Sequence, residues 1–371
     1  MAAETIVGTV IERMDELGFY TLAGHSAKPR DLVGEVQDAE RIGLGSAFVS
    51  ERFNTKDAAV LSGAVGAVSE SLGVATAATN HNTRHPMVTA TMAMTMHRLT
   101  EGRFALGLGR GINPLFDVMG VPRVTMAQLE DFIDVMRRMW RGEMIFGHDG
   151  PIGSYPMLFL MGEVDAEIPI LLTALGLRTL EFAGRVADAV VLHTFFTDET
   201  LARSVAAVRR GAEQAGRDPA SVRVWSVLAT IGDHIPDDLR LRKTVGRLAS
   251  YLQGYGDLLV EVNDWDPAVL ERFRQDEMVS TFAGAIDADA DADQLAHIAT
   301  LIPDEWLAAS AQGPPAVCAA RVLDQFSAGA DGVILHGATP AELEPVVEAY
   351  RPVRPAAVAA RAAANPGWFT S

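Results

Sequence analysis

The sequence predicts an eight-stranded parallel β/α barrel, and two observations support this fold class. Eight short runs are apolar throughout and often β-branched, which is typical of parallel strands that are covered on both faces. Amphipathic stretches follow most of these runs, and eight alternating β/α units close naturally into a barrel. With 371 residues, of which 49% are hydrophobic, the chain is long enough for one large core.

The eight predicted strands are identified by their apolar runs. In chain order they are FYTLA at 19–23, SAFVS at 46–50, LGVATAA at 72–78, RFALGLG at 103–109, IPILLTA at 168–174, DAVVLH at 188–193, VRVWSVLA at 222–229 and DGVILH at 331–336.

Three of the predicted helices begin with a recognisable signal. The segments Thr125–Gln128 and Thr339–Glu342 each have the spacing of a capping box, the second with proline at its first helical position. Pro86 begins a methionine-rich stretch of helical period, whose methionines we interpret as core residues.

Four segments lie outside a minimal barrel. Residues 143–168 are rich in glycine and aromatic residues and predict a hairpin inserted after the fourth strand. Residues 232–312 are too long for one connection and predict a helical insertion after the seventh strand. Residues 1–16 are interpreted as an N-terminal extension and 353–371 as a C-terminal tail. We expect residues 1–371 to form a single domain.

The composition excludes several classes of partner. The chain has 31 basic and 48 acidic residues, a net charge of −17, which disfavours binding to nucleic acid or to anionic lipid. No apolar run is long enough for a membrane span, and the N-terminus lacks the features of a signal peptide. The single cysteine, Cys318, fits a cytoplasmic protein.

The acidic run at residues 286–295 has the alternation of a calcium loop but not its other requirements. Counted from Asp287, the sixth position is Ala292 instead of glycine, and the twelfth is Ile298 instead of glutamate. We therefore expect a solvated acidic loop and no metal site.

Three glycines follow the fourth predicted strand and indicate a site there. Gly107, Gly109 and Gly111 do not have the spacing of a dinucleotide fingerprint, and the next helix cap comes only at Thr125. We interpret the small residues as a strand end that a flat ring system approaches closely. In a barrel, that end of the strands is the catalytic mouth.

Four longer stretches resemble the bacterial luciferase-like superfamily, and within it the branch that uses the deazaflavin coenzyme F420. They are AERIGLGSAFVSERF, NTRHPMVTATMAMTMHRLTEGRFALGLGRG, PILLTALGLRTLEFAGRVADAVVLH and IPDEWLAASAQGPPAVCAARVLDQFSAGADGVILHG. The resemblance spans about residues 17–352. It implies a homodimer and a cofactor at the barrel mouth, either F420 or, as in monooxygenases with this scaffold, FMN.

The resemblance also implies a location for each part of the cofactor. The ring rests near a non-proline cis peptide bond within residues 74–78, and the phosphate meets backbone N–H groups where a helix starts after the fifth strand. The residues expected to contact the cofactor are Ala75, Thr76, Ala77, Asn80, Gly109, Arg110, Gly111, Thr173, Ala174, Leu175 and Gly176.

Hydride exchange with a carbonyl carbon requires a group that transfers a proton to or from the substrate oxygen. His193 at the end of the sixth strand and His25 after the first are the candidates, because imidazole titrates near working pH. Glu51 is a third candidate base if burial raises its pKa, and an ion pair with Arg52 is the alternative.

The resemblance and the residues near the mouth together predict an apolar substrate. Related sugar-phosphate dehydrogenases have a lysine near the position of Phe196 and a glutamate near that of Ile112. We therefore expect an alcohol, ketone or enone, in a pocket formed by Arg52, Asn113, Phe116, Phe195 and Phe196. An FMN-dependent monooxygenase and a catalytically silent flavin-binding barrel are the alternatives.

Overall fold

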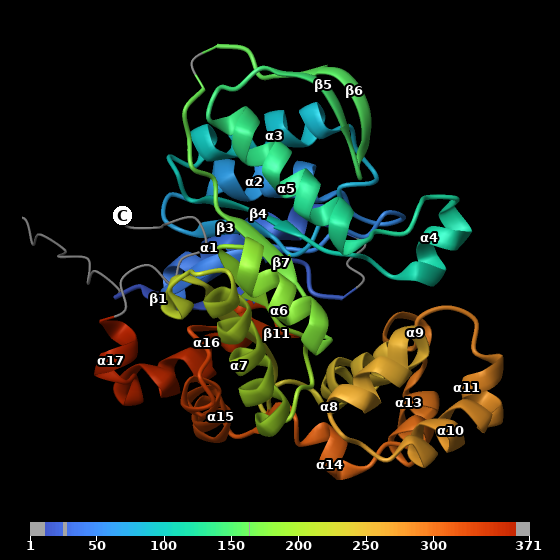
Figure 1. Cartoon of the computed structure of the whole chain (residues 1–371). Coiled ribbons are helices and arrows are strands. Elements are labelled where there is room, and N and C mark those ends of the chain that lie inside the picture. The colour runs from blue at the N-terminus through green and yellow to red at the C-terminus, as the bar shows by residue number, and fades with distance from the viewer. Residues whose placement is uncertain (1–11, 25–27, 163, 361–371) are drawn as a thin grey trace, which may run out of the picture.

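A computed structural model describes residues 12–24, 28–162 and 164–360 and confirms the predicted barrel (Figure 1). Eight strands pair in parallel in the order β1-β2-β3-β4-β7-β8-β9-β11, and β11 pairs with β1 to close the ring. The barrel strands are β1 (Met14–Tyr20), β2 (Leu44–Val49), β3 (Gly73–Thr76), β4 (Phe104–Leu108), β7 (Ile170–Thr173), β8 (Ala189–Val191), β9 (Arg223–Gly232) and β11 (Gly332–His336).

Helices follow the strands and form the outer layer of the barrel. They are α1 (Leu32–Ile42), α2 (Ala58–Val68), α3 (Pro86–Leu99), α4 (Asn113–Met119), α5 (Met126–Trp140), α6 (Leu177–Val186), α7 (Asp198–Gln214), α15 (Pro315–Ser327) and α16 (Pro340–Tyr350). Both predicted capping boxes are present, at Thr125 and Thr339, and Pro86 begins α3. No helix in the described part of the chain is both long and apolar enough to cross a membrane.

Two segments interrupt the β/α alternation. After α5, β5 (Ile145–Gly150) and β6 (Gly153–Leu158) form an antiparallel hairpin. Between β9 and β11 lies the helical insertion, which Figure 1 shows mostly in orange at one side of the barrel. It contains α8 (Asp237–Leu241), the π-helical turn η3 (Arg242–Gly246), α9 (Arg247–Val262), α10 (Pro267–Gln275), α11 (Glu277–Thr281), α12 (Ile286–Asp289), α13 (Ala292–Ala299), α14 (Asp304–Leu307) and the short strand β10 (Ala311–Gly313).

The first strand begins at Met14, five residues before the predicted position. Its sequence, MDELGFY, contains two acidic residues and is not an apolar run. Glu16 is nonetheless buried, because the hydroxyl of Tyr350 donates a hydrogen bond to it and Arg354 forms an ion pair with it at 2.7 Å. Arg354 belongs to the predicted C-terminal tail, where residues 351–353 form the short helix η4 and Ala356–Ala359 form α17.

The acidic run at 286–295 is not the solvated loop that we expected. It forms α12 and the start of α13, and Asp287 is buried in an ion pair with Arg247 at 2.6 Å. Asp291 accepts a hydrogen bond as the N-cap of α13. Two of its four acidic side chains, Asp287 and Asp291, are therefore used within the fold, while Asp289 and Asp293 are exposed.

Gly107 in β4 and Gly109 just after it serve strand packing, which corrects their interpretation as an opening for a ring. The backbone N–H of Gly107 donates to Thr76 Oγ1, and Thr76 Oγ1 donates to the Gly107 carbonyl, both at 2.8 Å. A Cβ on Gly107 would lie 1.7 Å from the carbonyl oxygen of Thr76, and one on Gly109 would lie 2.7 Å from Thr173 Oγ1. Neighbouring strand ends already occupy this space.

We predict that Gly107→Ala lowers the free energy of unfolding by about 1–3 kcal/mol or more, because the added Cβ would force the ends of β3 and β4 apart. Denaturant unfolding followed by circular dichroism measures the change. Gly63→Ala is the matched control, since a Cβ at Gly63 in α2 meets no atom within 4 Å. This control should gain about 0.5–1 kcal/mol from helix propensity. Equal stability of Gly107→Ala and wild type would contradict the prediction.

Candidate active site

The mouth of the barrel has one half lined by small residues and one lined by polar rings. The small half lies at the ends of β3 and β4, where Ala77, Ala78 and Gly109 carry nothing larger than a methyl group. The other half lies at the ends of β1, β8 and β11. There Tyr20 and His336 pack edge to face, with ring centroids 5.3 Å apart.

Backbone hydrogen bonds fix the small half. Ala77 and Ala78 are joined by a cis peptide bond, where the resemblance to the superfamily implied one. The Asn80 side chain donates to the Gly109 carbonyl at 2.7 Å, and the N–H of Thr79 donates to the Gly107 carbonyl at 3.0 Å. Among the residues expected to contact the cofactor, Ala75 and Thr76 are fully buried within the barrel.

Arg110 and Gly111 follow this half and are exposed. The Arg110 Nε donates to the carbonyl of Val124 at 3.0 Å, so this side chain is held toward the start of α5. Asn113, the first residue of α4, is also exposed.

The start of α6 is a site suited to an anion. Thr173, Ala174, Leu175 and Gly176 lead from β7 into this helix, and Gly176 is its N-cap. Among the described residues, no group accepts a hydrogen bond from the N–H groups of Leu177 and Arg178. These N–H groups and the helix dipole favour negative charge. The only atom close to a Cβ built on Gly176 is Leu258 Cδ1, at 4.0 Å.

His193 and Tyr255 form a hydrogen-bonded pair in the polar half. His193 Nδ1 lies 2.8 Å from the Thr194 carbonyl, which only accepts, so Nδ1 carries the proton. The hydroxyl of Tyr255 lies 2.7 Å from Nε2 and donates to it. Burial lowers the pKa of His193 to about 4 and raises that of Tyr255 well above its usual value. The pair is therefore neutral at working pH.

Helix α9 of the insertion crosses the mouth and supplies Tyr255. At one end, Arg247 Nη2 would lie 2.9 Å from a Cβ on Gly24, in the loop after β1. Further along, Tyr251 packs against His193 with centroids 4.8 Å apart, and Leu258 reaches Gly176. Positions 247, 251, 255 and 258 recur at helical spacing, a signal that the sequence analysis did not use. The helix is kinked at Tyr255.

Glu51 is committed to an ion pair, which argues against its predicted role as a base. Its partner is Arg84, at 2.6 Å, and not Arg52. The hydroxyl of Thr79 also donates to Glu51, and only 3% of the Glu51 side chain is exposed. Because Arg84 also pairs with Asp57, the three side chains join the loops after β2 and β3.

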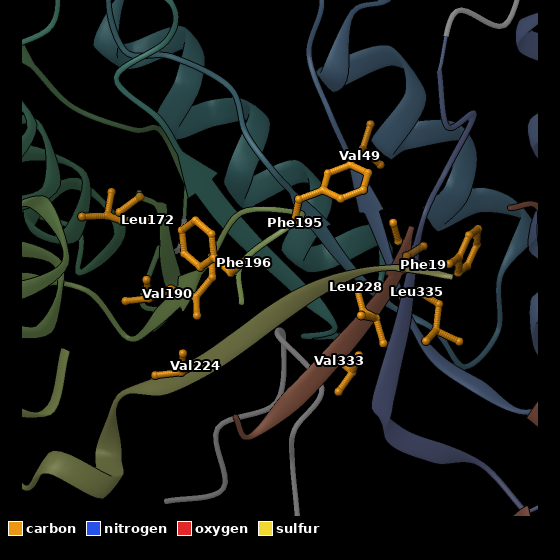
Figure 2. Packing of buried hydrophobic residues seen from close by; sticks show 14 of the residues in the cluster. Phe19, Val49, Leu172, Val190, Phe195, Phe196, Val224, Leu228, Val333 and Leu335 are labelled. Carbon is orange, nitrogen blue, oxygen red and sulfur yellow. The ribbon is translucent and has the colours of Figure 1, made fainter. Parts of the chain in front are cut away.

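The aromatic residues predicted to line the substrate pocket are largely buried. Phe195 and Phe116 are 0% exposed and Phe196 is 7% exposed. Figure 2 shows Phe195 and Phe196 among the buried apolar side chains. Phe195 and Phe116 therefore present no surface to a substrate in this structure, because hydrophobic packing encloses both rings. Arg52 is partly buried after β2, and His25 lies outside the described residues.

The structure also has an open hollow of about 710 Å³. Its walls come from the loops after β2 and β3 and from the end of α4, and include Phe53, Lys56, Arg84 and Met119. Glu51 is the only predicted site residue in its lining. The volume is in the range of small-molecule sites.

Comparison with known proteins identifies the family. Residues 16–332 match the luciferase-like monooxygenase family. The chain belongs to this family. The resemblance found in the sequence is thereby confirmed.

Within the family, two relatives are similar in sequence. A 5,10-methylenetetrahydromethanopterin reductase from Methanolobus tindarius is 28% identical over 305 residues, covering 80% of this chain and 86% of that protein. A phthiodiolone/phenolphthiodiolone dimycocerosates ketoreductase from Mycobacterium tuberculosis is 28% identical over 246 residues. The match covers 64% of this chain and 61% of that protein.

Two solved structures have the same fold. A coenzyme F420-dependent tetrahydromethanopterin reductase from Methanopyrus kandleri superposes with a TM-score of 0.75 at 19% identity, covering 91% of this chain and 99% of that chain. An F420-dependent secondary alcohol dehydrogenase, in complex with an F420-acetone adduct, has a TM-score of 0.69 at 18% identity. The superposition covers 92% of this chain and 99% of that chain.

We predict that stability falls as pH decreases from about 6.5 to about 4. The folded-state pKa of His193 is lowered from 6.5 to about 4, so in this window the unfolded chain binds a proton that the folded chain rejects. His193 alone accounts for at most about 3 kcal/mol. Urea unfolding at a series of pH values measures the effect. His193→Gln should reduce the pH dependence in this window, and an unchanged dependence would contradict the assignment to His193.

Proposed function

We propose that this protein is an F420-dependent oxidoreductase that transfers a hydride between the deazaflavin and the carbonyl or carbinol carbon of a small substrate. The observation that carries the proposal is the neutral His193–Tyr255 pair, held across the mouth from a strand end lined with small residues. The relatives named for F420, and the one named as a ketoreductase, support the cofactor and the reaction class. The proposal includes a homodimer and a cytoplasmic location.

The residues at the mouth fit such a cofactor. A flat ring requires a surface without large side chains, which Ala77 and Ala78 provide. A phosphate requires donors, which the N–H groups of Leu177 and Arg178 supply at the start of α6. When bound, F420 supplies or accepts the hydride.

Tyr255 and His193 handle the proton in this proposal. In the oxidising direction, the hydroxyl of Tyr255 receives the proton of the substrate alcohol and passes its own proton to His193 Nε2. The Thr194 carbonyl holds the imidazole in the tautomer that leaves Nε2 free to accept. The reverse direction returns the proton by the same path. Because the pKa of His193 is low, the protonated ring gives its proton up readily.

An FMN-dependent monooxygenase is the second candidate, because the family takes its name from such enzymes. Both cofactors contain a tricyclic ring and a phosphate, so the same mouth is compatible with either. The roles of the two cofactors differ, since a monooxygenase also requires oxygen as a substrate.

The first test is a direct comparison of F420 and FMN binding by equilibrium titration. We expect F420 to bind at least tenfold more tightly, and the bound cofactor to exchange a hydride with secondary alcohols or ketones. Preference for FMN, together with oxygen consumption on reduction, would favour the monooxygenase.

A variant in the same titration tests the position of the phosphate. Gly176→Asp places a carboxylate beside the free N–H groups, and like charges about 4 Å apart repel by about 4 kcal/mol at an effective dielectric constant near 20. We expect a loss of affinity of about a hundredfold or more. Gly63→Asp, in open space on α2, is the charge-matched control. Unchanged affinity in a folded Gly176→Asp protein would remove α6 from the proposal.

For the proton-transfer pair, we predict that His193→Ala lowers kcat by about 10²–10⁴-fold, the usual contribution of general acid–base catalysis. Tyr255→Phe removes only the hydroxyl and should cause a loss of similar size. Cofactor affinity should change little in either variant, because neither residue belongs to the phosphate site. Stopped-flow measurement of hydride transfer and a cofactor titration give the two values. Full activity in Tyr255→Phe with an inactive His193→Ala would exclude the relay through tyrosine.

A further inference from the structure

Three cationic side chains from two distant parts of the chain converge at the mouth. Arg52 and Lys56 lie at the two ends of a turn after β2, joined by backbone hydrogen bonds of 3.0 and 2.8 Å. Lys56 Nζ donates to the carbonyl of Leu22, in the loop after β1, at 3.0 Å. Arg247, at the start of α9, lies against Gly24 in the same loop. One loop is therefore in contact with both Lys56 and Arg247.

Within the part of the chain that the structure describes, two carboxyl groups lie beside these cations. Asp287 pairs with Arg247 at 2.6 Å. Glu35 accepts the N–H of Leu22 at 2.7 Å, and burial raises its pKa to about 7, so this carboxyl is only partly ionised at neutral pH. Among the more distant acids, Glu342 pairs with Lys243 at 2.5 Å, and Asp31 also acts on Glu35.

The cations are also poorly solvated. Only 7% of the Arg247 side chain is exposed, and its Nε has no hydrogen-bond partner among the described residues. Burial, together with the charge of Arg52, lowers the pKa of Lys56 to about 8. Burial and the charge of Arg247 lower the pKa of Arg52. Grouping like charges away from water is unfavourable, and a bound anion relieves that cost. Such a group stands out in a chain whose net charge is −17.

The cationic group lies across the mouth from the proposed phosphate site. The phosphate site follows β7, which is four strands from β1 around the eight-stranded ring. Arg247 and Tyr255 are eight residues apart on α9, a rise of about 12 Å along a helix. An anion at the cationic group is therefore within the length of a small molecule from the proton-transfer pair.

We propose that Arg52, Lys56 and Arg247 bind a carboxylate or phosphate group of the substrate, whose reacting carbon then lies beside His193 and Tyr255. This anionic group distinguishes the proposed substrate from the apolar one that the sequence predicts. The placement of the reacting carbon rests on the proposed function. The binding of an anion does not. The other source of the same chemistry is the anionic side chain of the cofactor itself.

Inorganic phosphate is the probe, titrated into the cofactor-free protein by calorimetry. We expect one site that Arg52→Gln and Lys56→Gln each weaken by about tenfold or more, as for the loss of one charge-assisted hydrogen bond. Arg210→Gln, which removes an exposed cation on α7, is the charge-matched control and should bind phosphate like wild type. Circular dichroism checks that each variant is folded.

No phosphate binding by the wild-type protein would overturn the proposal. An equal effect in all three variants would also overturn it, since that outcome indicates only a general effect of net charge. Because no F420 is present, this titration succeeds or fails independently of the proposed function.

A second titration, with F420 at saturation, identifies the source of the anion. If the group binds the substrate, phosphate still binds to the F420-loaded protein, and Arg52→Gln and Lys56→Gln leave F420 affinity unchanged. If F420 blocks phosphate binding and both variants lose affinity for F420 by about tenfold, the site belongs to the cofactor and its assignment to the substrate is wrong. Failure of F420 to bind at all would contradict the proposed function alone.

Discussion

The hydrogen bond from Tyr255 to His193 connects two parts of the chain that sequence keeps far apart. His193 ends a barrel strand, whereas Tyr255 lies in a helix of the insertion. This bond, with the contacts of Arg247 at one end of α9 and Leu258 at the other, determines how the helix lies over the mouth. The helix adds Tyr251 and Tyr255 to the polar half, whose other rings come from the barrel. Without it, the strand ends would offer a ring surface and a phosphate site but few groups for a substrate.

Much of the fold follows from local patterns. Buried parallel strands need apolar side chains on both faces, so seven of the eight strand positions are apparent as apolar runs. Capping boxes specify helix starts because they satisfy N–H groups within four residues. The start of β1 was missed because the partners of Glu16, Tyr350 and Arg354, are more than 300 residues away. The interpretation of Gly107 failed for a similar reason, since its constraint comes from Thr76 on the neighbouring strand.

The candidate site was predictable only where a strand end determines the position of a side chain. His193 was proposed on that ground, and it lies at the mouth. Glu51 follows a strand in the same way, but its role depends on Arg84, a partner that strand position does not reveal. Tyr255 and Arg247 share a helix face at regular spacing, and such a face ordinarily indicates packing against a core. Which surface α9 covers is a property of the tertiary structure, so the sequence alone did not single these residues out.

The position of α9 also has an evolutionary consequence. Under the proposed function, the residues that hold the cofactor lie in the barrel, on loops whose backbones are fixed by neighbouring strands. Many of the groups that face the substrate lie instead in one contiguous stretch, residues 232–312. Under that proposal, substitutions in the stretch at positions other than Tyr255 change the fit of the substrate and leave the cofactor sites of the barrel in place. Varied substrates with one cofactor are therefore the expected pattern among relatives that differ mainly in this insertion.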